Sequence, residues 1–105
     1  MTFIPWIIFV IAALLEVGGD ALIRRGLRGG GILFIFVGLA VLSSYGLVVN
    51  CVKWDFAKML GVYVAFFALV SVLCSRVIFK ETISLSTWTG LAVIMLGGFI
   101  IQFGK

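Results

Sequence analysis

The residue of this sequence best suited to chemistry is Glu16, a carboxylate within an otherwise apolar stretch. In a membrane-spanning helix a charge at that depth costs about 3 kcal/mol or more, so Glu16 should face a partner, a cavity or water. Surroundings of low polarity favour the neutral form of a carboxyl group, and such a glutamate can exchange protons near neutral pH. Ala12 and Gly19, one turn away, allow another helix or a flat cation to approach closely. The simpler alternative is a protonated Glu16 that hydrogen-bonds a neighbouring helix.

A second carboxylate, Asp20, follows Glu16 by one helical turn, and Arg24 follows Asp20 by another turn. This spacing puts the three side chains on one stripe of a helix. Asp20 is therefore either a second carboxylate of a binding site or the partner of Arg24 near the membrane boundary. We favour the pairing with Arg24, because charges without partners are costly inside a membrane.

Polar and aromatic side chains in the following two stretches could complete a binding site. Ser44 and Tyr45 lie midway along the second apolar stretch, and Tyr63 and Phe66 lie in the third. Their hydroxyl groups and rings could orient a cationic substrate or hold Glu16. Hydroxyl side chains in membrane helices also commonly bond a backbone carbonyl one turn away, and the sequence leaves this alternative open. The candidates for proton and substrate binding are Glu16, Asp20, Ser44, Tyr63 and Phe66.

The last apolar stretch contains glycines at a seven-residue interval, at Gly90, Gly97 and Gly104. Such spacing leaves one helix face almost without side chains, and small residues allow helices to pack closely in lipid. Gly90 and Gly97 are therefore the candidates for dimer packing. Packing within a single chain is the alternative, and the sequence alone does not decide between the two.

The residue types that most enzymes and metal sites need are scarce in this chain. There is no histidine, and Cys51 and Cys74 form no CxxC motif. Two isolated cysteines without histidine do not make a metal site, so we expect packing roles for both. The sequence also lacks a nucleophile and base pair or a cofactor motif. We expect neither an enzyme nor a bound cofactor.

The elements that must position these residues follow from composition. Of the 105 residues 64% are hydrophobic and 11% are charged, which excludes a soluble domain. About 20 apolar residues in a helix cross a membrane once, and the connections between the stretches are too short for another domain. We predict an all-α integral membrane protein in which residues 1–105 form a single domain of four transmembrane helices. Their expected ranges are roughly 3–24, 30–52, 56–79 and 84–103.

The formal net charge of +4 comes from basic residues near the expected helix ends. Basic residues there ordinarily contact lipid headgroups and set the topology, so we expect membrane lipids and no nucleic acid as partners. One side holds Arg24, Arg25, Arg28, Arg76 and Lys80, and the other holds Lys53, Lys58 and Lys105. A difference of five against three is small enough for insertion in both orientations.

The whole chain resembles the small multidrug resistance family of the drug/metabolite transporter superfamily. The resemblance rests on the length, on Glu16 within AALLEVGGDALIRRGL, on Ser44, on Tyr63 shortly after Gly61, on FKE at 79–81 and on GLAVIMLG with Gly90 and Gly97. Family members carry a tryptophan three residues after the tyrosine, whereas this chain has Phe66. The region of the third and fourth expected helices, 56–79 and 84–103, also resembles small flippase subunits that move lipid-linked sugars. Those subunits typically lack the glutamate.

The resemblance implies an antiparallel homodimer in a bacterial inner membrane. Two Glu16 side chains would face a cavity that opens to each side in turn, and protons would compete there with a cationic substrate. The leading interpretation is a proton-coupled exporter of small organic cations of the quaternary ammonium or guanidinium kind. The alternatives are a flippase-like transporter of lipid-linked or other metabolites, and a non-transporting membrane subunit. A heterodimer is the alternative to two identical chains.

Overall fold

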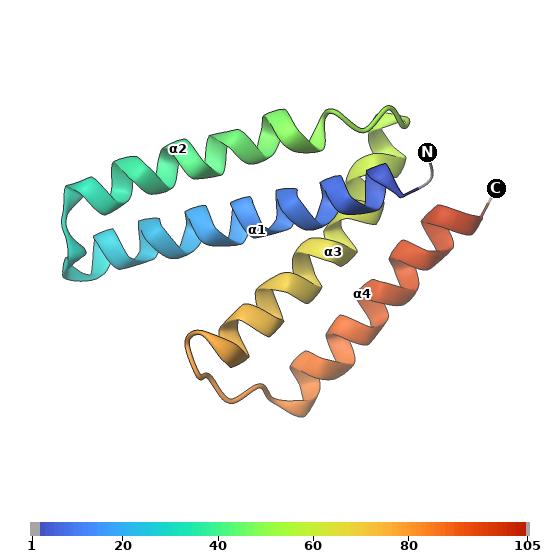
Figure 1. The fold of residues 1–105 in the computed structure, drawn as a ribbon. Helices are drawn as coiled ribbons and strands as arrows, with labels where there is room; N and C mark the ends of the chain where they lie inside the picture. Colours follow the sequence, from blue (N-terminus) through green and yellow to red (C-terminus); the bar gives the residue numbers. More distant parts are fainter. Residues whose placement is uncertain (1–2, 105) are drawn as a thin grey trace. The chain divides into compact units, whose positions relative to one another are not determined.

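The computed structural model describes residues 3–104 and consists of α-helices, with no strand among these residues. The helices are α1 (Ile4–Arg25), α2 (Ile32–Val49), α3 (Phe56–Val77) and α4 (Leu85–Phe103), as Figure 1 shows. A short π-helical segment, η1 (Gly26–Gly30), continues α1 into the connection with α2. All four helices are long and apolar enough to cross a membrane. The predicted all-α class and the presence of four helices long and apolar enough to span a membrane are thereby confirmed, which suggests a multi-pass membrane protein.

The observed helices follow the predicted ranges, and the largest difference lies at the end of α2. This helix was expected to reach residue 52 and ends at Val49. The Asn50 side-chain amide donates a hydrogen bond to the carbonyl of Gly46 at 2.8 Å. Asn and similar short polar side chains that bond the nearby backbone compete with helix continuation. The chain then turns through Val52, whose backbone N–H donates to the carbonyl of Val49 at 3.2 Å.

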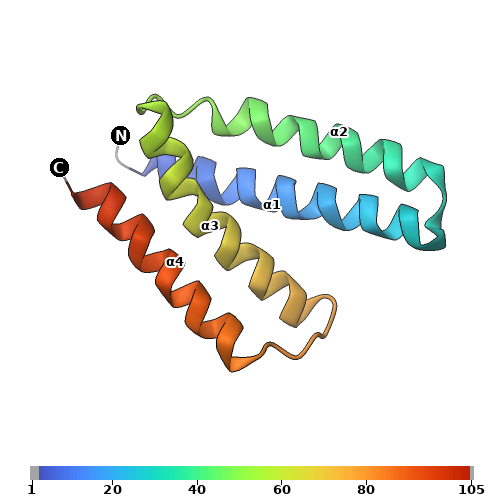
Figure 2. The same cartoon turned by 180° about the vertical axis from the view of Figure 1, so that it is seen from behind.

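The chain forms two compact units, Met1–Val52 and Lys53–Lys105. The first contains α1 and α2, and the second contains α3 and α4. In each unit the two helices run side by side in opposite directions, as the front and rear views show (Figures 1 and 2). Each unit is thus a helical hairpin.

Glycines fix the register of α1 against α2. A Cβ atom added at Gly19 would lie 2.7 Å from the backbone nitrogen of Leu42. One added at Gly38 would lie 2.7 Å from the Cγ1 atom of Ile23, and one at Gly26 would lie 2.5 Å from the side chain of Ile35. Residues 19, 23 and 26 of α1 therefore oppose residues 42, 38 and 35 of α2. The steps of three and four along both helices define one continuous packing face, which we call the α1–α2 seam.

The α3–α4 hairpin uses glycines in the same way. A Cβ atom at Gly98 would lie 2.8 Å from the Cβ atom of Ala65, and one at Gly61 would lie 2.7 Å from the Cδ1 atom of Ile101. Ser84 begins α4, because its hydroxyl oxygen accepts a hydrogen bond from the backbone N–H of Thr87 at 3.2 Å. A serine cap of this kind satisfies a donor that the first helical turn leaves open.

Large apolar side chains are exposed along every helix. Leu33 of α2 is 71% exposed and Phe99 of α4 is 65% exposed, and α1 and α3 carry similar residues. In water so much exposed hydrocarbon would be strongly unfavourable, whereas in a bilayer it contacts lipid chains at no such cost. The surface chemistry therefore agrees with the apolar composition of the four spans.

Candidate functional site

Glu16 belongs to the α1–α2 seam. It precedes Gly19 by one turn on the same face of α1, and the register set by Gly19 and Leu42 places Tyr45 of α2 opposite it. The carboxylate of Glu16 acts electrostatically on the Tyr45 hydroxyl group, which agrees with this register. Both side chains are half-buried. The structure therefore brings a carboxylate and a phenol together within one hairpin.

The sequence had named Tyr45 only as one hydroxyl group among several, and had not selected it for the site. The signal that identifies it is the spacing of small residues on both helices. Gly19 and Gly38 mark the seam, and Tyr45 lies one heptad after Gly38 on that face. A heptad interval returns a residue to the same side of a packed helix.

Ser44, whose hydroxyl group was selected from the sequence, forms a hydrogen bond within its own helix. Its Oγ atom donates a hydrogen bond to the backbone carbonyl of Val41 at 2.6 Å, and the neighbouring Ser43 donates to that of Leu39 at 2.8 Å. This is the backbone alternative that the sequence left open. Ser44 is half-buried and stands one position away from Tyr45 in the helix, off the line of the seam.

Asp20 lies beside the seam and is exposed, as is Arg24. In the described part of the chain no salt bridge joins the two side chains, although one helical turn separates them. The neighbouring seam positions are occupied by Gly19 and Ile23. The structure thus brings Glu16 close to Tyr45 and leaves Asp20 on the flank of the same helix.

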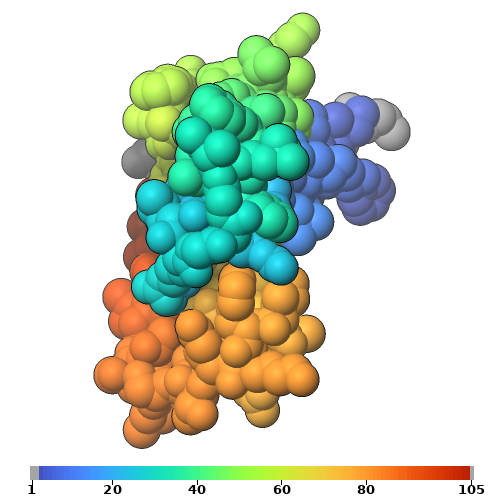
Figure 3. Space-filling view, turned by 90° about the vertical axis from the view of Figure 1, so that its left-hand side faces the viewer, coloured from blue at the N-terminus to red at the C-terminus, as the bar shows by residue number. Residues whose placement is uncertain are grey.

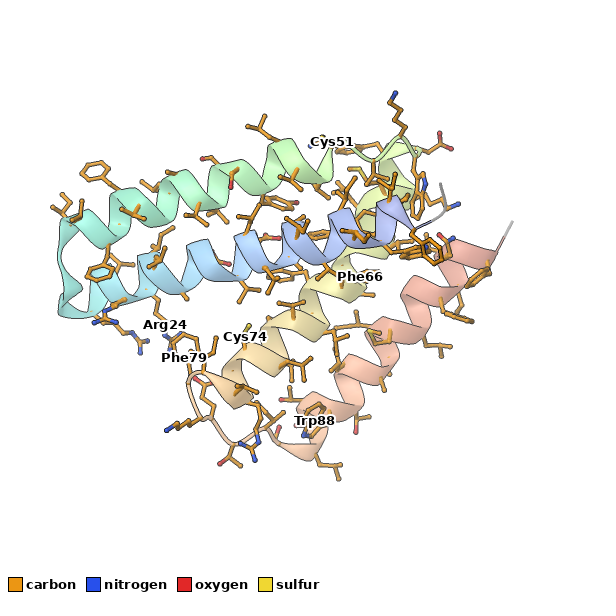
Figure 4. All side chains as sticks on the ribbon, viewed as in Figure 1. Arg24, Cys51, Phe66, Cys74, Phe79 and Trp88 are labelled. Atoms are coloured by element: carbon orange, nitrogen blue, oxygen red, sulfur yellow. The ribbon has the colours of Figure 1, made fainter. Side chains whose placement is uncertain are left out.

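Tyr63 and Phe66 lie on α3, in the second unit. The Tyr63 side chain is 3% exposed, and its ring centroid is 6.4 Å from that of Phe67 at an interplanar angle of 36°. Phe66 is half-buried and is labelled in Figure 4. Glu16, Asp20 and Ser44 therefore belong to one hairpin, and Tyr63 and Phe66 belong to the other.

Gly90 and Gly97 do not take part in the packing of α4 against α3. A Cβ atom added at either glycine would meet nothing within 4 Å, whereas the adjacent Gly98 lies directly on Ala65. Gly90 is exposed and Gly97 is half-buried. Packing within a single chain was the alternative that the sequence left open for these glycines. In the α3–α4 hairpin it is Gly98 that makes the packing contact.

Among the described residues there is no group of three or more His, Cys, Asp or Glu side chains that could hold a metal ion. The chemistry available at the seam is that of one carboxylate and one phenol. These groups can bind a proton or a cation. Comparisons with family models, with curated proteins and with solved structures find no match for this chain.

Proposed function

We propose that this protein is a proton-coupled exporter of small organic cations, in which Glu16 binds either a proton or the substrate. The observation that carries the proposal is the carboxylate of Glu16 in the α1–α2 seam opposite Tyr45, within a helix long and apolar enough to span a membrane. An ionisable side chain at such a position is costly, and a functional role accounts for that cost.

One carboxylate can couple two fluxes because its occupants exclude each other. A protonated Glu16 has no charge with which to hold a cation, and a bound cation favours the ionised form. Tyr45 can donate a hydrogen bond to the ionised carboxylate or offer its ring face to a cation. Export of one cation would then require that a proton binds to the same Glu16 side chain and is carried inward. Competition between the two for one carboxylate would couple their transport.

A single hairpin pair encloses little space, so we propose that two copies form the transport cavity. The face of α4 at Gly90 and Gly97 would supply the contact, because a Cβ atom added at either glycine would meet no described atom of the chain within 4 Å. Close helix packing in lipid needs such residues. The arrangement proposed is an antiparallel homodimer in a bacterial inner membrane, as in the small multidrug resistance family that the sequence resembles.

Proteoliposomes with an imposed pH gradient test this function. Wild-type protein should exchange protons for tetraethylammonium or guanidinium. Uptake of the organic cation should fall as the pH is lowered, because protons compete with it for Glu16. Glu16→Gln should abolish this exchange, because the amide binds neither a proton nor a cation by charge. Glu81→Gln is the matched control, since Glu81 is exposed in the α3–α4 connection outside the spans. Transport by Glu16→Gln at the wild-type rate and pH dependence would exclude Glu16 as the proton carrier.

A further inference from the structure

The hairpin between α1 and α2 concentrates positive charge at one end of the first unit. Arg24, Arg25 and Arg28 fall within five residues, and all three are exposed. Between Glu16 and Asp55 the sequence contains a single acidic residue, Asp20, and the first turn of α2 contains none. The three guanidinium groups therefore have little negative charge from their own hairpin to balance them. Figure 3 views the molecule from this end, with the hairpin in light blue to turquoise, and Figure 4 labels Arg24.

The turn holds one of these arginines in a defined place. The Cζ atom of Arg25 lies 4.8 Å from the ring centroid of Phe34, in the first turn of α2. Gly30 makes this contact possible, because a Cβ atom there would lie 2.7 Å from the Arg25 carbonyl oxygen and 3.1 Å from the Phe34 ring. Gly29 and Gly31 turn the chain with φ values of 101° and 104°, which glycine adopts without strain. Stacking on an aromatic face leaves the edge of the guanidinium free to donate hydrogen bonds.

An apolar hollow lies next to this arginine. It has a volume of about 130 Å³ and is lined by Leu22 of α1 and by Leu33, Phe34 and Val37 of α2. Phe34 connects the arginine and the hollow, because its ring contacts the Arg25 guanidinium group and also lines the hollow. The Arg25 guanidinium group and a hydrocarbon-lined hollow are therefore next to each other within one hairpin. A free phosphate ion would make no favourable contact in the apolar hollow. A phospholipid has both a phosphate group for the arginine and a hydrocarbon chain for the hollow.

We propose that the α1–α2 hairpin binds one anionic phospholipid, with the headgroup phosphate on Arg25 and Arg28 and the start of an acyl chain in the hollow beside Phe34. Guanidinium groups suit phosphate because their planar, forked donors match two of its oxygen atoms. Basic side chains at the membrane surface add attraction for lipids of net negative charge. This site is separate from Glu16 and does not depend on the transport function.

Native mass spectrometry of the detergent-solubilised protein tests the headgroup contact. Phosphatidylglycerol and phosphatidylcholine with identical acyl chains are offered in equal amounts, and the retained lipid is counted. Wild-type protein should prefer phosphatidylglycerol, and Arg25→Gln/Arg28→Gln should lower that preference roughly tenfold, given the usual attraction per basic residue. Arg76→Gln/Lys80→Gln removes two charges from the other hairpin and should leave the preference unchanged. Equal losses in both double variants would show general charge attraction and overturn the site.

Filling the hollow separates a lipid from a free anion. Val37→Trp places a large ring among the lining residues at a position that is 44% exposed, so the helix itself should tolerate it. The variant should lose much of the phosphatidylglycerol retention while the helix content by circular dichroism stays that of the wild type. Inorganic phosphate should not displace the lipid from the wild-type protein. Displacement by phosphate together with full retention by Val37→Trp would show a simple anion site and overturn the proposal.

Discussion

At the scale of single residues, Glu16 and Tyr45 lie opposite each other across the α1–α2 seam. A carboxylate in a span needs groups that stabilise it, and Tyr45 is the phenol that the helix register brings opposite it. Hydrogen bonds to charged groups contribute about 1.5–3 kcal/mol, more than bonds between neutral groups. If the proposed cation site is correct, the position of Tyr45 affects how tightly that site binds a cation beside an ionised carboxylate.

Tyr45→Phe should weaken cation binding roughly tenfold, because the ring is kept while the hydroxyl group opposite Glu16 is lost. Ser44→Ala is the matched control and should bind as the wild type does, since the Ser44 hydroxyl is used on the Val41 carbonyl. Isothermal titration with tetraethylammonium in detergent measures both constants. A larger loss in Ser44→Ala than in Tyr45→Phe would move the site to the other hydroxyl group.

Asp20 offers a second test at this scale, because it is exposed and lies beside the seam that contains Glu16. We expect Asp20→Asn and Arg24→Gln each to leave the pH dependence of cation binding nearly unchanged. The measurement is binding affinity across a pH series for the wild type and the two variants. A displacement of the profile by a full pH unit in Asp20→Asn alone would place Asp20 inside the binding site.

At the scale of helices, the close approach of α1 to α2 depends on Gly19. Adjacent glycines at positions 18 and 19 differ sharply in their surroundings: a Cβ at Gly19 would lie 2.7 Å from the backbone of Leu42, and one at Gly18 would meet nothing within 4 Å. A backbone atom cannot yield as the end of a flexible side chain can. Substitution at Gly19 must therefore shift a helix.

Gly19→Ala should destabilise the protein by about 1–3 kcal/mol, the usual range for overpacking. Gly18→Ala should be neutral or stabilising by up to about 1 kcal/mol, because alanine has the higher helix propensity and finds open space. Unfolding in mixed micelles of increasing dodecyl sulfate content, followed by circular dichroism, compares the two. Equal midpoints would mean that the helices do not pack through Gly19.

At the scale of the whole molecule, the adjacent residues Gly97 and Gly98 allow the proposed self-association to be tested apart from folding. Among residues 3–104, a Cβ atom added at Gly97 would meet nothing within 4 Å, whereas one added at Gly98 would lie 2.8 Å from the Cβ atom of Ala65. Gly97→Val should leave the unfolding midpoint of a chain close to that of the wild type while weakening self-association. Gly98→Val should lower the midpoint, since it pushes α4 away from α3. Cross-linking in membranes together with unfolding curves gives both quantities, and a fully dimeric, active Gly97→Val would exclude a dimer contact there.

The basic residues make a prediction about orientation at the same scale. Five of them lie on one side of the predicted topology and three on the other, a weak bias for the translocation machinery. We expect both orientations in the membrane. In a chain whose free cysteines Cys51 and Cys74 are replaced by serine, a cysteine tag after the C-terminus is labelled by an impermeant reagent in spheroplasts. The tag should react in about half of the molecules. Labelling of all molecules, or of none, would show a single orientation.

The sequence by itself determined the number and extent of the spans. Hydropathy is a property of each residue, and a membrane requires its helices to be apolar along about 20 residues, so the four helices can be read without knowing their packing. The end of α2 is the main departure, because Asn50 bonds the backbone there. The proposal of a functional role for Glu16 also came from the sequence, because a charge in an apolar stretch is conspicuous whatever surrounds it.

The tertiary structure decided which residues face each other. Gly97 follows the seven-residue pattern, yet it is Gly98 that packs on Ala65, and nothing in the spacing distinguishes these neighbours. Tyr45 rather than Ser44 lies opposite Glu16 for a similar reason. In lipid there is no hydrophobic drive that would mark the buried side of a helix with apolar residues, since both sides are apolar. The register of two packed helices is set instead by the positions at which their backbones can approach closely. These positions depend on both helices together, so the sequence of one helix does not predict them.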